Sequence, residues 1–323
     1  MKEEPVMPPA TPHPSSPPGH LCRAGKTVKI AVARRILLAF SLFITAGLQY
    51  SLAAPQTYRF ALVTDRQDDV MSGAEQGISE ANLQGRFLDK QYTLSRYASA
   101  DTGDISGRDY VAILAALPAR KVLALAKAFP DHAVFNLTAK SNKLRTLCLP
   151  NLLHVIPSDK MYAGARRQWH EKHGKATILV SAWHPDFVKF AARDLNKRYK
   201  AAFNKPMDER AWAGWAAVKM TSDHLARDDD DNPAAVLTAL KTGLAFDGQK
   251  GLSMYFRGNG QLRQILLVED KSGELLGEAP VRGVAAPNDV DSLGVLSCAR
   301  ERQRDQRVRP PVPDGRTIPI PRR

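Results

Sequence analysis

Residues 133–158 read AVFNLTAKSNKLRTLCLPNLLHVIPS, in which two short apolar runs flank a polar loop. Residues 133–135 and 152–156 have the continuous apolar character of strands that are buried on both faces. Ser158 then offers an N-cap for a helix that starts near Asp159. Two buried-type strands joined by a polar loop predict that the chain crosses here from one sheet to another.

The loop between these runs carries hydroxyl groups at Thr138 and Ser141, shortly after the first strand. In open α/β sheets, ligands bind beyond the carboxyl ends of the strands. Both hydroxyls are therefore expected where a small polar solute can be held. The alternative is an ordinary polar surface loop without a ligand.

Upstream of this stretch, strand-like and helix-like patterns alternate. Apolar runs end in a polar loop at Asp65 or in a break at Leu117-Pro118, and helical patterns follow. Such alternation predicts an α/β fold with a parallel sheet. We expect strands at 58–64, 91–97, 110–116 and 133–135, and helices at 70–83 and 121–129.

Downstream of a helix at 161–173 and a strand at 176–181, the alternation stops. Trp212 and Trp215 share one helical face, which is more typical of a core than of a ligand platform. A Gly258-Asn259-Gly260 turn predicts a hairpin, and a second turn follows at 270–273. The expected helices are 187–203, 208–225 and 233–242, and the hairpin strands are 252–256 and 261–269.

The N-terminal part of the chain is predicted to be a targeting segment and not part of the fold. Residues 1–25 are rich in Pro and predict a disordered extension. Residues 26–54 combine a basic segment, an apolar run at 36–48 and small residues at Ser51-Leu52-Ala53, which is typical of a secretory signal peptide. The alternative is a retained membrane anchor, but the apolar run is shorter than the roughly 20 residues that a spanning helix needs.

Most of the basic excess lies at the two ends of the chain. The net charge is +13, of which residues 1–54 carry +4 and residues 299–323 carry +5. The middle therefore keeps only +4, without a basic patch that is studded with aromatic residues. We do not expect the folded part to bind nucleic acid.

The chain has three cysteines, Cys22, Cys148 and Cys298. Cys22 precedes the apolar run and is expected to be lost with the leader. The two that remain can form one disulfide in an oxidising compartment. The alternative is that Cys148 is a small buried residue and Cys298 a free thiol near the C-terminus.

Several ordered stretches between residues 57 and 298 carry a family resemblance. Taken together, they resemble the type I periplasmic solute-binding proteins of ABC transporters, the leucine/isoleucine/valine-binding class, and most of all its branch associated with PQQ-dependent alcohol oxidation. The stretches are Phe135-Asn136, Lys143-Leu144-Arg145, Cys148, Asn151-Leu152-Leu153-His154, Pro157-Ser158, Met161, Trp212-Ala213-Gly214-Trp215-Ala216-Ala217-Val218-Lys219, Asp247-Gly248-Gln249-Lys250-Gly251, Phe256-Arg257, Gly260-Gln261-Leu262-Arg263-Gln264, Leu293-Gly294 and Cys298.

The resemblance implies two α/β lobes with a ligand cleft between them and three crossings of the chain. It also implies a small-molecule solute, a membrane permease as partner and a periplasmic location, with membrane contact only through the signal peptide or the permease. Residues at strand ends would line the wall of the first lobe, and hydroxyl and amide groups there can hold a carboxylate. By motif position these residues are Thr64, Asp65, Pro118, Ala119, Thr138 and Ser141.

The second lobe departs from the family pattern because one clear strand, 176–181, stands where several strand–helix units are expected. We therefore expect a periplasmic-binding-protein-like parallel sheet lobe with a truncated second lobe. The expected organisation is a disordered extension (1–25), a signal peptide (26–54), a first lobe (55–156), a shortened second lobe (157–205), a return to the first lobe with a C-terminal hairpin (206–298) and a disordered Arg/Pro-rich tail (299–323).

We expect no enzymatic activity, no cofactor and no metal ion. No nucleophile and base converge in the sequence, and no CxxC or Cys/His spacing suits zinc. A second hypothesis is a degenerate relative that acts as a sensor or interaction module without transport.

The leader is expected to be removed near Ala53, because small residues stand at the two positions that signal peptidase reads. N-terminal sequencing of the protein recovered from the periplasm tests this. A chain that accumulates in the cytoplasm and still begins at Met1 would contradict both the predicted export and the solute-binding hypothesis.

Overall fold

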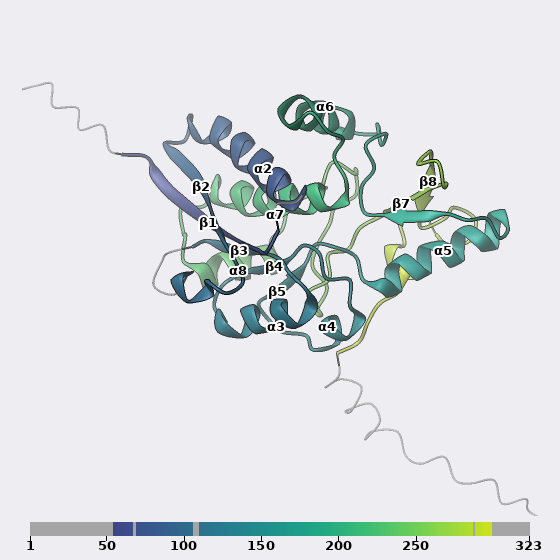
Figure 1. The fold of residues 1–323 in the computed structure, drawn as a ribbon, viewed down its shortest axis with the longest axis horizontal. Helices are drawn as coiled ribbons and strands as arrows, with labels where there is room; N and C mark the ends of the chain where they lie inside the picture. The colour runs from purple at the N-terminus through teal and green to yellow at the C-terminus, as the bar shows by residue number, and fades with distance from the viewer. Residues whose placement is uncertain (1–53, 67–68, 106–109, 287, 299–323) are drawn as a thin grey trace, which may run out of the picture. The chain divides into compact units, whose positions relative to one another are not determined.

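Five parallel strands form the larger of two sheets in the computed structural model (Figure 1). The structure describes residues 54–66, 69–105, 110–286 and 288–298, so the expected extension, signal peptide and tail lie outside the described residues. The spatial order is β2-β1-β3-β4-β5, and the parallel α/β sheet expected from the sequence is confirmed. The strands are β1 Gln56–Thr64, β2 Lys90–Tyr97, β3 Ala112–Ala116, β4 Val134–Asn136 and β5 Leu152–His154.

The predicted crossing between the strands at 133–135 and 152–156 is wrong. These strands are β4 and β5, which are neighbours in the same sheet and pair in parallel, with Phe135 opposite Leu153. The short helix α4 (Asn142–Thr146) between them returns the chain to the sheet that it left. The chain crosses to the second sheet one element later, after β5.

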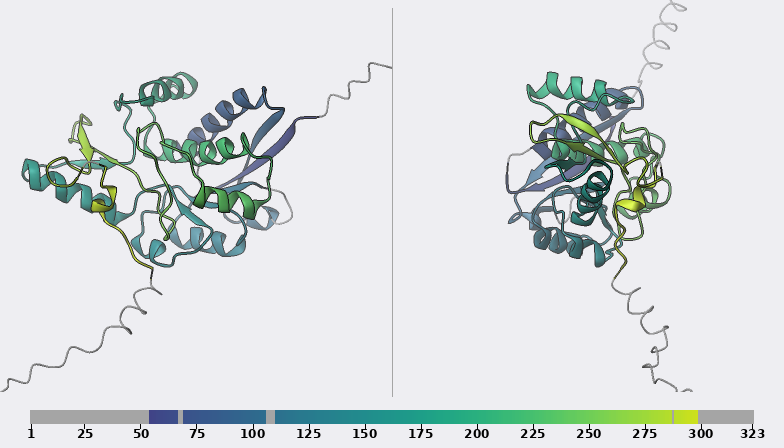
Figure 2. Two further views of the ribbon diagram at one scale, coloured as in Figure 1. Left: turned by 180° about the vertical axis from the view of Figure 1, so that it is seen from behind. Right: turned by 90° about the vertical axis from the view of Figure 1, so that its right-hand side faces the viewer.

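Helices cover both faces of the larger sheet (Figures 1 and 2). Phe60 and Leu62 of β1 face a core shared with α2 (Asp69–Gly85) and α7 (Glu209–Leu225). Ala61 and Val63 face the opposite core, shared with α3 (Ala119–Ala128) and α4. Burial on both faces is the reason that the strands read as continuous apolar runs.

The helices α2 and α7 touch through their backbones. A Cβ added to Gly73 of α2 would collide with the carbonyl oxygen of Ala211 in α7, and one added to Gly214 would collide with the carbonyl oxygen of Val70. Two glycines at facing positions therefore set how closely the helices approach. Trp212 and Trp215 of α7 are fully buried beside this contact, as the expected core role requires.

The smaller sheet has three antiparallel strands, β6 Leu179–Ser181, β7 Leu266–Glu269 and β8 Leu275–Ala279. The helix α5 (Asp159–His173), capped by Ser158 as expected, packs on it through Met161, Ala165 and Trp169. Residues 206–298 were expected to return to the first lobe and to end there in a hairpin. This is wrong for β7 and β8, because they belong to the same sheet as β6.

The hairpin expected around Gly258-Asn259-Gly260 is reduced to one antiparallel bridge, between Phe256 and Leu262. The returning chain bonds to β5 instead, since His154 N–H donates to Gly260 O at 2.7 Å and Leu262 N–H donates to His154 O at 2.9 Å. The backbone thus pairs with a strand far back in the sequence, which local alternation could not indicate.

The helix expected at 187–203 begins later, as α6 (Ala192–Phe203). Phe190 has a φ of +54°, outside the right-handed helical region, so the helix cannot extend through it. This segment was expected in the second lobe. In the structure, α6 instead contacts α2 beside the larger sheet, since Arg198 Nε lies 2.8 Å from Glu80 Oε1. The third expected helix is α8 (Pro233–Thr242), and short 3-10 helices lie at Thr102–Ile105 and Val290–Leu293.

A disulfide joins Cys148 to Cys298, with sulfur atoms 1.97 Å apart and Cα atoms 5.6 Å apart. These are the two thiols that we expected to pair after removal of the leader. The bond fastens the last described residues beside the loop between α4 and β5.

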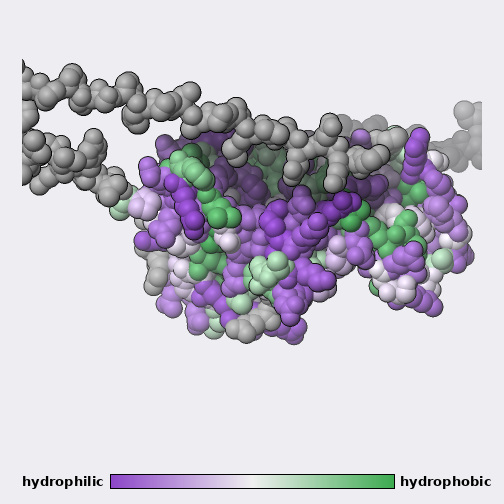
Figure 3. All heavy atoms as spheres, turned by 90° about the horizontal axis from the view of Figure 1, so that it is seen from above, coloured by the Kyte–Doolittle hydropathy of each residue, from purple (hydrophilic) through white to green (hydrophobic). Residues whose placement is uncertain are grey.

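The surface is mainly hydrophilic in the middle of the face shown in Figure 3, and hydrophobic residues form separate patches there. Scattered hydrophobic residues are common on soluble surfaces and need no partner to explain them. None of the helices in the described ranges is long and apolar enough to cross a membrane.

Gly73→Ala is expected to lower the free energy of unfolding by about 1–3 kcal/mol, because the added methyl group forces α2 and α7 apart. Gly103→Ala is the matched control, since a Cβ there meets no atom within 4 Å. Chemical unfolding followed by tryptophan fluorescence measures both, and equal stabilities of the two variants would contradict the close helix contact.

Candidate functional site

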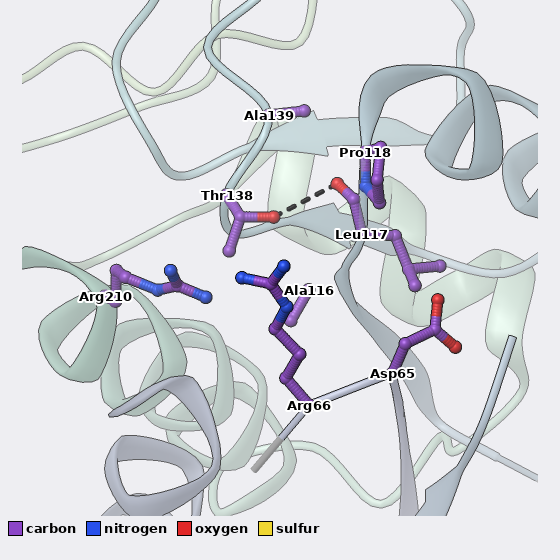
Figure 4. A pocket seen from close by; sticks show the side chains of 8 residues that line it. All are labelled: Asp65, Arg66, Ala116, Leu117, Pro118, Thr138, Ala139 and Arg210. Atoms are coloured by element: carbon purple, nitrogen blue, oxygen red, sulfur yellow. Dashed lines mark hydrogen bonds between the residues drawn. The ribbon is translucent and has the colours of Figure 1, made fainter. Parts of the chain in front are cut away.

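A pocket of about 410 Å³ opens at the carboxyl ends of β1, β3 and β4 (Figure 4). The segment after β1, the segment after β3, the loop after β4 and the start of α7 form its wall. The lining residues are Asp65, Arg66, Ala116, Leu117, Pro118, Thr138, Ala139 and Arg210.

The strand order explains why the pocket lies there. The chain leaves β1 toward α2 on one face of the sheet, whereas it leaves β3 toward α3 on the other face. Two adjacent strands whose connections diverge leave a crevice outside their carboxyl ends, and this is where open α/β sheets bind ligands. The pocket therefore occupies the position that the topology favours.

Three of the six residues expected to bind ligand line this pocket: Asp65, Pro118 and Thr138. The other three do not. Thr64 is buried and donates its hydroxyl proton to Arg66 O, Ala119 begins α3 outside the lining, and Ser141 caps α4 by accepting from Leu144 N–H.

Asp65 is held by the chain itself. Its carboxylate accepts from Lys121 Nζ at 2.7 Å, from Ser99 N–H at 2.8 Å and from Ser99 Oγ at 2.9 Å. These bonds, with Lys121 as the largest cause, lower the pKa of Asp65 to about 2. The side chain is therefore a fixed anion that already has a cationic partner at its side.

Thr138 shapes the wall between β3 and β4. Its hydroxyl donates to Leu117 O at 3.1 Å, so the oxygen lone pairs remain for a ligand. Asn136, at the end of β4, holds the same loop because its Oδ1 accepts from Ala139 N–H at 2.9 Å and its Nδ2 donates to Ala139 O at 2.8 Å. The loop that carries Thr138 is thus tied down on both sides.

A buried guanidinium supports this loop from behind. Arg145 of α4 donates to Ala139 O at 2.6 Å, Ser141 O at 3.0 Å, Ile156 O at 2.7 Å and Gln261 Oε1 at 2.9 Å. The side chain is fully buried, and burial lowers its pKa to about 10, so it stays charged near neutral pH. One cation therefore joins the pocket loop, the exit from β5 and the returning chain.

Arg66 and Arg210 were not among the residues predicted from the sequence. Their guanidinium groups point toward one another in the pocket, and the carboxylate of Asp65 lies apart from them (Figure 4). Arg66 could have been found from its place directly after Asp65. Arg210 lies in the first turn of α7, behind the N-cap Asp208, and no local signal connects it to the strand ends.

A second carboxylate joins the two sheets beside the pocket. Glu209 of α7 accepts from Lys140 at 2.6 Å, from the hydroxyl of Tyr162 in α5 at 2.7 Å and from Ala182 N–H, next to β6, at 2.9 Å. Burial and the adjacent Glu209 carboxylate raise the pKa of Tyr162, so the phenol remains a hydrogen-bond donor. None of the described lining residues, by contrast, comes from the smaller sheet.

The described residues hold no group of three or more His, Cys, Asp or Glu side chains arranged for a metal ion. The pocket wall itself carries two guanidinium groups, the hydroxyl group of Thr138 and aliphatic surface. Such a wall suits reversible binding of a small solute.

Solved structures of transport proteins resemble this fold. A substrate-binding protein from Desulfitobacterium hafniense in complex with Leu matches with a TM-score of 0.60 and 13% identity over 68% of this chain and 100% of that chain. The leucine-binding protein LivK of Thermotoga maritima matches with a TM-score of 0.55 and 11% identity, over 69% of this chain and 98% of that chain. LivJ of Streptococcus pneumoniae in complex with isoleucine matches with a TM-score of 0.57 and 10% identity, over 69% of this chain and 99% of that chain.

No protein-family model and no curated protein sequence matches the chain. The structural likeness shows that the chain has the α/β fold of the periplasmic substrate-binding proteins. At these identities it shows the fold alone.

Arg145→Met is expected to lower the free energy of unfolding by about 3 kcal/mol or more, because four hydrogen bonds from one charged group are lost at once, those to the carbonyl oxygens of Ala139, Ser141 and Ile156 and to Gln261 Oε1. The control is Arg86→Met, an exposed arginine in the turn after α2, which should unfold like the native protein. Urea unfolding followed by circular dichroism measures both. An Arg145→Met protein of native stability would show that the guanidinium is not needed.

Proposed function

We propose that the chain is the extracytoplasmic solute-binding component of an ABC transporter and holds a small polar organic molecule for uptake. The observation that carries this proposal is the position of the pocket at the diverging ends of β1 and β3, on the fold of periplasmic substrate-binding proteins. Fixed side chains on loops at the end of a rigid sheet are the usual means by which such folds bind ligands.

The implied partner is a membrane permease, and the implied location is the periplasm. The signal-peptide pattern of residues 26–54 supports this location. The sequence resemblance to the branch associated with PQQ-dependent alcohol oxidation adds a metabolic setting, in which alcohol-derived metabolites are among the solutes to try. No catalytic step and no cofactor form part of this proposal.

The second lobe is proposed to be shortened, with consequences for affinity. The smaller sheet has three short strands with α5 packed on it, and it contributes no described residue to the pocket lining. A pocket with one wall makes fewer contacts and excludes less water, while the entropy lost on association is unchanged. Weak binding follows from this geometry.

A second candidate function follows from the same one-walled pocket. A relative that has lost transport could act as an extracytoplasmic sensor or interaction module. A permease encoded beside the gene, together with measurable solute binding, would favour the transport function over this alternative.

Ligand affinity is expected to be about 100 μM or weaker, for the reasons of contact and entropy given above. Calorimetry of the purified mature chain against small acids, amino acids and alcohol-derived metabolites measures it. A nanomolar ligand would show that the second lobe closes over the pocket after all.

Thr138→Ala should weaken the binding of any ligand by a further 0.5–1.5 kcal/mol, roughly one hydrogen bond. Ser141→Ala is the matched control, because Ser141 caps α4 and does not line the pocket. Equal losses in the two variants would contradict the site.

A further inference from the structure

A strap of five residues, 294–298, leads from the smaller sheet to the larger one. It begins after the 3-10 helix Val290–Leu293 and ends at Cys298, which is bonded to Cys148 shortly before β5. Along this length the chain forms neither a helix nor a strand. The strap is drawn in yellow below α5 in Figure 1, where it runs towards α4.

The start of the strap is attached to α5. Leu293 is buried in the core that α5 shares with the smaller sheet. The backbones are so close there that a Cβ added to Gly164 would lie 2.0 Å from Leu293 O. Lys160 Nζ then donates to Val295 O at 2.7 Å. The first half of the strap therefore moves with α5.

The end of the strap is attached to the larger sheet. Asn259 Nδ2 donates to Leu296 O at 2.7 Å, and the next residue, Gly260, accepts from His154 N–H of β5 at 2.7 Å. The disulfide joins Cys298 to Cys148, which lies between α4 and β5. The second half of the strap therefore moves with β5.

The strap closes a triangle whose other two sides are β5 and the first turns of α5. These two elements meet at the crossing 155–158. A change in the angle between them would change the distance from Leu293 to Cys148, which the strap spans. A chain of five residues reaches at most roughly 18 Å, and the disulfide makes its far end permanent. The length of the strap thus limits how far the two sheets can turn apart.

Buried hydrogen bonds tie the first crossing of the chain to the last. Gln264 lies just before β7, and its Nε2 donates to Val155 O just after β5 at 2.6 Å. Lys250 Nζ donates in turn to Gln264 Oε1 at 2.9 Å. Both side chains are buried, so sliding one crossing past the other would leave polar groups unpaired away from water.

The crossing that leaves β6 is held against α7. Ala182 N–H donates to Glu209 Oε2 at 2.9 Å. The buried Trp183 stacks on Trp212, with ring centres 5.9 Å apart and ring planes 10° apart. A close-packed aromatic stack of this kind does not slide freely. All three crossings are therefore fixed in position, and they define the line about which the sheets could still turn.

We propose that the strap locks the angle between the two sheets, with the disulfide between Cys148 and Cys298 as its fastening. The crossings fix the hinge line, and the strap prevents rotation about it. The described part of the chain is then one rigid body, in which the hinge closure of two lobes is blocked. This rigidity belongs to the fold and holds with or without a solute in the pocket.

The experiment measures the distance between the two sheets by double electron–electron resonance on the mature chain, with no solute added. One nitroxide replaces the side chain of Arg86, in the turn after α2, and the other replaces that of Lys175, after α5. Both positions are exposed. The nitroxides are attached to introduced keto amino acids, so that the native cysteines are not labelled.

Two variants release the strap in different ways. Cys148→Ser combined with Cys298→Ser removes the fastening. A Gly-Ser-Gly-Ser insertion between Gly294 and Val295 gives the strap slack, while it keeps the disulfide and its contribution to folding. The matched control carries the same insertion between Asp230 and Asp231, in the exposed loop before α8.

The native chain and the control are expected to give a single narrow distance distribution. Both strap variants should broaden it by at least about twofold, because rotation of the sheets about the hinge line then becomes possible. Their circular dichroism spectra should match that of the native chain, since the strap contains no helix or strand.

A broad or two-peaked distribution in the native chain would overturn the proposal. A distribution of native width in the variant with the lengthened strap would overturn it as well, because the angle would then be held by the crossings alone. Neither result bears on solute binding, which calorimetry tests separately.

Discussion

The hydrogen bonds of the buried Arg145 guanidinium hold both the pocket loop after β4 and the segment by which the chain leaves β5 for the smaller sheet. It reaches three segments that are separate in the sequence: the loop after β4, the chain leaving β5 and the returning chain at Gln261. A charged group with no exposed surface is stable only when its donors are satisfied, and here backbone carbonyls and an amide oxygen satisfy them. The guanidinium and the loop that carries Thr138 therefore stabilise one another.

Polar contacts join the two sheets, and a disulfide fixes the end of the described chain. Glu209 bonds to Tyr162 in α5 and to Ala182 beside β6, which links the start of α7 to the smaller sheet. The disulfide between Cys148 and Cys298 fastens the end of the described chain beside the larger sheet. The smaller sheet and α5 also bury a hydrophobic core of their own, which includes Met161, Trp169 and Leu266.

The pocket is lined from one side only. In proteins with two complete lobes, closure around the ligand supplies a second set of contacts and excludes water. Here the described lining comes from the larger sheet and from the start of α7, and the smaller sheet adds no residue to it.

The sequence by itself determined the elements of the larger sheet and the places where its strands end. Periodicity and capping are local, and so the parallel sheet, the cap at Ser158 and the pocket positions of Asp65 and Thr138 could be predicted. Pairing between distant segments is not local. Only the tertiary structure decided that β4 and β5 are neighbours, that β7 and β8 join β6, and that Arg210 lines the same pocket as Arg66, because these arrangements depend on packing and on hydrogen bonds between residues far apart in the chain.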